Sequence, residues 1–201
     1  MPALRYAQFQ SNIARSRELV GLGQAIAGIT VGTVDAADMY RAALVQCVAA
    51  VDSYVHDVVL DYAVDIVKGL RAPGSPSRVG LHITAVSSLT GSANPVELEL
   101  RARAAINERL SQDTYQKPED IAKAFTMVGV PGLWVGAFGN ANAAGTVKRN
   151  LNLVVGRRNR IVHRCDLDPT GTGAVLPLSD ADALDAITTV EAAITGIDTF
   201  V

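Results

Sequence analysis

The residues best suited to chemistry in this 201-residue chain lie in one segment, GRRNRIVHRCDLD, which runs from Gly156 to Asp168. The segment holds four arginines and one histidine. The planar guanidinium of arginine binds phosphate oxygens through two parallel hydrogen bonds, and histidine, with an ordinary pKa of about 6.5, exchanges protons near neutral pH. These residue types together suit chemistry at a phosphate group.

Helical periodicity places one of these arginines where a charge is unexpected. At about 100° per residue, Arg158 falls near the middle of an apolar face, whereas Arg157, Arg160 and Arg164 point roughly the opposite way, toward solvent. An unpaired guanidinium buried in a core is strongly destabilising, so we expect Arg158 to face an acid, an interface or a ligand. The predicted apolar face consists of Val147, Leu151, Val154, Val155, Ile161, Val162 and Cys165.

The spacing of the polar residues predicts a site shared between two copies of the chain. Asn159 and His163 are four residues apart and therefore lie on one edge of the helix, a turn apart. Arg158 and His163 are five apart, roughly 140° around the axis, so a single helix makes only a loose site. Two copies meeting across a two-fold axis would face a common cleft, and we therefore expect a homodimer.

The composition predicts a single globular domain over residues 1–201. Hydrophobic residues make up 49% and charged residues 19% of the chain, as in proteins with a packed core. The net charge of −2 excludes a global attraction to nucleic acid, so any RNA contact must be local. Cys47 and Cys165 form no metal-type or redox-type pair and are expected to be buried thiols in a reducing compartment.

No segment is expected to span a membrane. Leu19–Val34 is too short and lacks the cationic start of a signal sequence. Phe125–Val147 is long enough but contains Pro131 and five glycines, which would leave backbone groups unpaired in lipid, so a packed helix–loop–helix is expected there. We expect a soluble, cytoplasmic protein.

The regular spacing of apolar residues along the chain is almost entirely helical, which predicts an all-α bundle with two long core helices, extra short helices and no significant sheet. A long helix over 35–70 carries a continuous apolar stripe and should form the spine of the fold. The residues 21–33 are rich in glycine and are expected to be a connection. Further helices are expected over 4–20, 79–89, 94–110, from 118, over 145–164, and from the capping residue Ser179 to the C-terminus.

The segment Arg158, Asn159, His163, on the penultimate helix, resembles the motif of HEPN ribonucleases: an arginine, a polar residue, a short spacer and a histidine. RRNRIVHRCDLDP also resembles the corresponding segment of the RiboL-PSP-HEPN branch, and ALVQCVAAVDSYVHDVVLDYA, residues 43–63, resembles its long second helix. Arg157 lies within the permitted spacing too, but it is followed by another arginine and is expected to point away from the face.

The resemblance implies a HEPN-like fold and a metal-independent endoribonuclease of toxin or phage-defence type, without a cofactor. The ribose 2′-hydroxyl would attack the neighbouring phosphate and leave 2′,3′-cyclic phosphate and 5′-hydroxyl ends. His163 would transfer protons, Arg158 would clamp the phosphate, and Asn159 would orient the imidazole or a phosphate oxygen. A local basic path for RNA is expected from Arg157, Arg160, Arg164, Lys148 and Arg149.

Asp52 is a candidate supporting residue, because it flanks the apolar stripe of the long helix and could pair with Arg158. His56 and His82 are expected to be structural, since no carboxylate–histidine or Cys/His cluster of metal-binding type accompanies them.

Two other functions remain open at this point. One is a non-catalytic HEPN scaffold that binds RNA or a partner protein. The other is a toxin silenced by a nucleotidyltransferase antitoxin, although such toxins commonly carry Tyr-x-Tyr after the histidine, where this chain has Arg164, Cys165 and Asp166.

Overall fold

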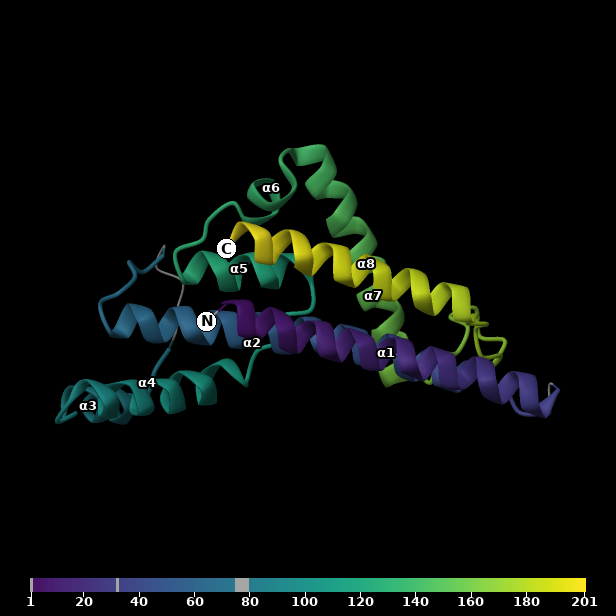
Figure 1. The fold of residues 1–201 in the computed structure, drawn as a ribbon, viewed down its shortest axis with the longest axis horizontal. Helices are drawn as coiled ribbons and strands as arrows, with labels where there is room; N and C mark the ends of the chain where they lie inside the picture. Colours follow the sequence, from purple (N-terminus) through teal and green to yellow (C-terminus); the bar gives the residue numbers. More distant parts are fainter. Residues whose placement is uncertain (1, 32, 75–79) are drawn as a thin grey trace.

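The computed structural model describes residues 2–31, 33–74 and 80–201, which form an all-α bundle (Figure 1). The described residues contain no sheet, and their one β-type pairing is an isolated bridge between Leu167 and Val175. The helices are α1 (Pro2–Thr30), α2 (Ala37–Val67), α3 (Ile83–Thr90), α4 (Pro95–Leu110), α5 (Pro118–Met127), α6 (Leu133–Phe138), α7 (Ala141–Arg164) and α8 (Asp180–Phe200).

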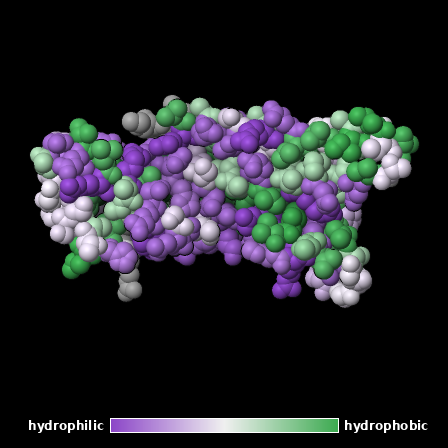
Figure 2. Space-filling view, turned by 90° about the horizontal axis from the view of Figure 1, so that it is seen from below, coloured by the Kyte–Doolittle hydropathy of each residue, from purple (hydrophilic) through white to green (hydrophobic). Residues whose placement is uncertain are grey.

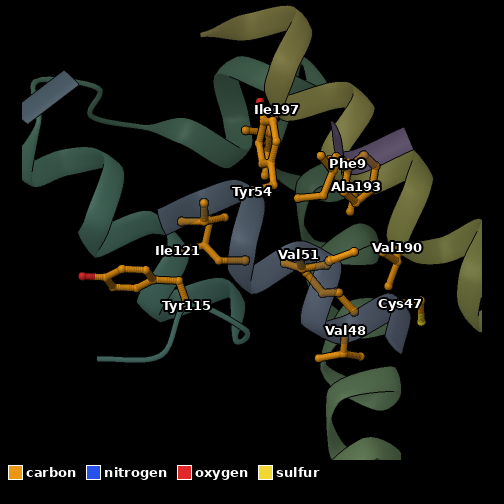
Figure 3. Close-up of a cluster of buried hydrophobic side chains, with 14 of the residues drawn as sticks. Phe9, Cys47, Val48, Val51, Tyr54, Tyr115, Ile121, Val190, Ala193 and Ile197 are labelled. Carbon is orange, nitrogen blue, oxygen red and sulfur yellow. The ribbon is translucent and has the colours of Figure 1, made fainter. Parts of the chain in front are cut away.

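The core lies between α1, α2 and α8. α1 and α2 run antiparallel along the length of the molecule, and α8 lies against both (Figure 1). With 31 residues, α2 is roughly 46 Å long, and the predicted stripe is buried except for Ile66, which is only partly covered. In Figure 3, Phe9 of α1 and Val190, Ala193 and Ile197 of α8 converge on the face of α2. The expectation of a long spine helix is confirmed.

The first helix is longer than expected, because it continues through the glycine-rich residues 21–30 to Thr30. Gly23 explains part of this result. A Cβ atom built at position 23 would lie 2.6 Å from Cε1 of Tyr40, so glycine lets α1 approach α2 closely. The prediction of a connection over 21–33 was wrong for residues 21–30, since packing against α2 outweighs the low helix propensity of glycine.

Side-chain caps explain where several helices begin. Asn94 accepts a hydrogen bond from the Glu97 backbone N–H, as expected, and Ser179 forms a reciprocal capping box with Asp182. Asn140 caps α7 in the same way through Ala143 N–H, so that α7 begins four residues before the predicted start. The short helix α6 was not predicted separately. The start expected for the third helix, position 79, lies outside the described residues.

α7 runs across the bundle rather than along it, and contacts α2, α5, α6 and α8 (Figure 1). Leu151, Val154 and Val155 are buried, as predicted, and Val147 and Ile161 are partly buried. Val162 is 46% exposed and Cys165 is exposed, so the predicted apolar face does not continue into the last turn. Cys47 is buried, which raises the pKa of its thiol to about 12, whereas the prediction that Cys165 is buried was wrong.

Among the described residues, α2 alone is long and apolar enough, by length and composition, to cross a membrane. In the bundle most of its apolar length is buried, because α1, α4, α5, α7 and α8 all contact this helix. The apolar side chains of α2 therefore form part of the protein core.

Candidate functional site: a basic groove at the end of α7

A buried carboxylate fixes the chain where α7 ends. Cys165 and Asp166 both adopt left-handed backbone conformations, with φ of 49° and 56°, and together reverse the chain. The Asp166 side chain is fully buried, and its Oδ2 accepts hydrogen bonds from Arg157 at 2.7 Å and from Arg41 of α2 at 3.2 Å. Both arginines also donate to the carbonyl oxygen of Leu176. This cluster ties α7, α2 and the following loop together.

The cluster corrects the predicted direction of Arg157. This side chain was expected to point to solvent, opposite the apolar face, but it binds Asp166 and the carbonyl oxygens of Leu176 and Pro177. The helical period was correct, but the loop after α7 folds back and covers the side of the helix on which Arg157 lies. Arg157 is a structural residue in this arrangement, and its guanidinium is already bound to a carboxylate.

The loop that follows Asp166 forms the second wall of the site. Its two arms are joined by hydrogen bonds from Leu176 N–H to Asp166 O (2.9 Å) and from Asp168 N–H to Ala174 O (2.8 Å). The Asp168 carboxylate accepts hydrogen bonds from Thr170 N–H and from the Thr172 hydroxyl. The hydrogen bonds from Thr170 in particular lower the pKa of Asp168, so that its carboxylate is held ionised within the loop.

An open groove of about 1020 Å³ lies between α7 and this loop. Asn159 and His163 both line the groove, as expected for residues one turn apart on one edge of a helix. His163 is exposed, so its imidazole is accessible to a ligand. The other lining residues are Gly156, Arg160 and Arg164 of α7 and Leu167, Asp168, Pro169 and Gly171 of the loop.

Arg158 lies beside the groove and does not line it. The side chain is half-buried, and one terminal nitrogen donates to Asn159 Oδ1 at 3.1 Å. Its Nε is buried and has no hydrogen-bond partner. Arg158 therefore contacts the groove through Asn159, and the arginines that face the groove directly are Arg160 and Arg164.

The site is strongly basic, although the protein is acidic. α7 contains six lysines and arginines and no acidic residue, which gives it a charge of +6, and the other 177 residues therefore carry −8. Within residues 2–31, 33–74 and 80–201, no carboxylate lies within 4.0 Å of the guanidinium nitrogens of Arg158, Arg160 or Arg164. A cluster of unpaired guanidinium groups favours an anionic ligand.

The other two basic residues of α7, both expected on the RNA path, lie outside the groove. Lys148 forms a 3.6 Å ion pair with Glu119. Arg149 donates to the hydroxyl of Thr146 at 3.0 Å. Neither side chain lines the groove, so the local positive charge there comes from the last two turns of α7.

The expected pairing of Asp52 with Arg158 was wrong. The Asp52 carboxylate accepts a hydrogen bond of 2.5 Å from Tyr115 N–H and one of 3.4 Å from the Gln116 side chain. It therefore fixes the chain between α4 and α5. His56 contacts the carbonyl oxygens of Asp52 (2.8 Å) and Leu110 (3.0 Å), which agrees with the structural role expected for it. His82 is exposed at the start of α3.

The fold and the site define an all-α protein with a basic, histidine-containing groove at the end of its penultimate helix. Comparisons with protein-family models, with curated proteins and with solved structures found no match. In the part of the chain that the structure describes, no group of three or more His, Cys, Asp or Glu side chains is arranged to hold a metal ion.

Two features of the site were missed in the sequence. Asp166 lies next to the predicted motif, but nothing in the local pattern shows that its side chain turns inward. Gly156, which lines the groove, could have been noticed in the sequence. Glycine in the interior of a helix costs about 1 kcal/mol of stability relative to alanine, so its presence there suggests a functional or packing role.

Proposed function

We propose that this protein is an endoribonuclease of HEPN type that cleaves RNA without a metal ion. The observation that carries the proposal is the groove itself. It presents a histidine, an amide and two arginines without acidic partners on one face of α7. These are the groups needed to bind a phosphodiester and to move protons at it. The resemblance of Arg158, Asn159 and His163 to the HEPN motif supports the same assignment.

The reaction requires two proton transfers. The ribose 2′-oxygen forms a bond to phosphorus while the bond from phosphorus to the 5′-oxygen breaks. One proton leaves the 2′-hydroxyl, and one is delivered to the departing 5′-oxygen. His163 accepts or donates one of these protons, and the guanidinium groups of Arg160 and Arg164, with Arg158 behind Asn159, stabilise the charge that develops on the phosphate oxygens.

A second copy of the chain would bring a second Arg158, Asn159 and His163 to the same cleft, while water exchanges the other proton. The last turns of α7 and the loop after it expose apolar side chains, with Val162, Leu167 and Val175 between 42% and 51% exposed. In Figure 2, hydrophobic side chains gather to the right of centre, in the part of the molecule where Figure 1 places the end of α7. Apolar surface beside a charged site suits a subunit interface, so we propose a homodimer across the ends of α7.

Cleavage of purified RNA in the presence of a chelator tests the function. We expect 2′,3′-cyclic phosphate and 5′-hydroxyl ends on RNA and no cleavage of DNA, which lacks the attacking hydroxyl. His163→Ala should abolish cleavage, and Arg158→Lys, which keeps the charge but removes the planar guanidinium that donates to Asn159, should nearly abolish it. Arg17→Lys, far from the groove in an exposed ion pair with Glu191, should leave cleavage unchanged. Cleavage that depends on added magnesium would contradict this mechanism.

Mixing two inactive variants tests the shared site. If a dimer brings both motifs to one cleft, a mixture of His163→Ala and Arg158→Lys proteins forms heterodimers with one intact histidine and one intact arginine, and part of the activity returns. No recovery, together with a monomer at all protein concentrations in sedimentation, would refute the dimer. RNA binding by wild-type protein without any cleavage would instead identify a non-catalytic RNA-binding module.

A toxin role is a further part of the proposal. Expression of the wild-type chain should arrest growth, and expression of His163→Ala should not. A cognate antitoxin would be recognised by its ability to restore growth and to bind the wild-type protein. Relief of toxicity by covalent nucleotide addition, detected as a mass increase, would identify the nucleotidyltransferase type of antitoxin.

A further inference from the structure

Gly156 is a glycine that the fold itself does not require. It lies in the interior of α7, where glycine destabilises the helix, and a Cβ atom built there would meet no other atom within 4 Å. Gly21 and Gly28 of α1 are similarly open, whereas other helical glycines allow close packing. A Cβ at Gly136 would lie 2.2 Å from the Phe200 ring, and one at Gly196 would lie 2.5 Å from the Phe138 ring. Gly156 has no such neighbour among the residues that the structure describes.

The surroundings of Gly156 indicate what approaches it. Gly156 lines the same groove as Asn159, Arg160 and His163, and lies two turns before His163, roughly 10 Å along the helix axis. Without a side chain at position 156, the helix backbone is bare at this point of a basic groove. Glycine at such a position allows a ligand backbone to come close to the protein backbone.

We propose that Gly156 is the contact point for the ribose-phosphate backbone of the RNA next to the cleaved phosphate. This inference rests on the proposed ribonuclease function and extends it to a second part of the substrate. The strand would run along the groove from His163 toward Gly156, with its phosphates beside Arg160 and with the loop Leu167–Gly171 as the opposite wall. A side chain at position 156 would obstruct this path without disturbing the fold.

The test is Gly156→Gln, with Gly156→Ala as a smaller change and Gly21→Gln as the matched control. Gly21 is also a helix-interior, exposed glycine at which a Cβ would meet nothing within 4 Å, but it lies in α1, outside the groove. Gly156→Ala, and Gly21→Ala as its own control, should each raise Tm by roughly 2–4 °C. Binding is measured by fluorescence anisotropy with a mixed-sequence 2′-O-methyl RNA, which cannot be cleaved, and cleavage is measured with unmodified RNA.

We expect Gly156→Gln to weaken binding by roughly tenfold or more, the loss expected when the added side chain displaces a phosphate from its hydrogen bond to the charged Arg160, and to slow cleavage, while Gly21→Gln changes neither. If the wild-type protein cleaves RNA and Gly156→Gln behaves identically, the inference is overturned and the ribonuclease function stands. If wild-type protein neither binds nor cleaves RNA, the proposed function fails and this inference with it. Loss of dimers in Gly156→Gln, at unchanged RNA affinity per protomer, would assign Gly156 to a subunit contact and would likewise overturn the inference.

Discussion

Replacing Asp166 by asparagine tests whether Arg157 stabilises the fold through Asp166. Asparagine keeps the size of the side chain and tolerates the left-handed backbone at position 166, so the substitution mainly removes one negative charge. Arg157 would then lie without a carboxylate partner, and Arg41 would keep only the exposed carboxylate of Asp38, in a site where the two arginine side chains are 23% and 12% exposed. Removing one partner of a buried ion pair typically costs about 3–5 kcal/mol. In a domain of this size that corresponds to a fall in Tm of roughly 6–20 °C.

Thermal and urea unfolding followed by circular dichroism measure this change. The matched control is Glu191→Gln, which breaks the more exposed pair with Arg17 and should cost only about 0.2–1 kcal/mol. Because Asp166 anchors the loop that forms one wall of the groove, the variant should also lose RNA cleavage at temperatures where it is still folded. A loss of stability for Asp166→Asn no larger than that for Glu191→Gln would refute the assignment of Arg157 as a structural residue.

Three further outcomes are expected. Gly23→Ala should destabilise the protein by about 1–3 kcal/mol, because the added methyl group overlaps the ring of Tyr40; unchanged urea unfolding would show that α1 can shift at no cost. Burial alone would raise the pKa of Asp61, but hydrogen bonds from its two arginine partners outweigh this effect and lower the pKa. The stabilisation is therefore present above the ordinary aspartate pKa and is lost as pH falls through the lowered value, so acid unfolding should be less steep in Asp61→Asn. Asp52→Ala should lose about 1 kcal/mol of stability through the hydrogen bond to Tyr115 N–H and should keep its RNA cleavage.

The sequence predicted most of the fold because its strongest signals are local. The three- and four-residue steps of α2 and the caps at Asn94 and Ser179 each determine structure within a few turns. The errors occur where tertiary contacts determine the ends of a helix. The helix α1 continues through Gly23 because α2 packs there, and the start of α7 depends on Asn140, whose capping role is visible only once the preceding loop is placed.

The site was predicted less well, because the surroundings of its arginines depend on the loop that follows α7. A helical wheel assumes that one face of α7 is buried along its whole length. In the structure the core ends after Val155, and the loop beyond Asp166 then covers a different side of the last turns. Asn159 and His163 were placed correctly, because their relation depends only on the helix itself. Arg157 was placed wrongly, because its environment is made by a loop.

The arrangement of carboxylates decides which arginines remain available to a phosphate. The acid that was expected from Asp52 comes instead from Asp166, and it binds Arg157. Nη2 of Arg157 is bound to Asp166 and to two backbone carbonyl oxygens, and its Nε is buried, so this guanidinium cannot offer two parallel N–H groups to a phosphate. Arg160 and Arg164, in contrast, face the groove with no acid within 4.0 Å among the described residues. Arg158 is also without an acid and supports Asn159 from behind. Phosphate binding therefore depends on Asp166 indirectly, because this residue takes one arginine out of the cluster and holds the loop against which the others form a groove.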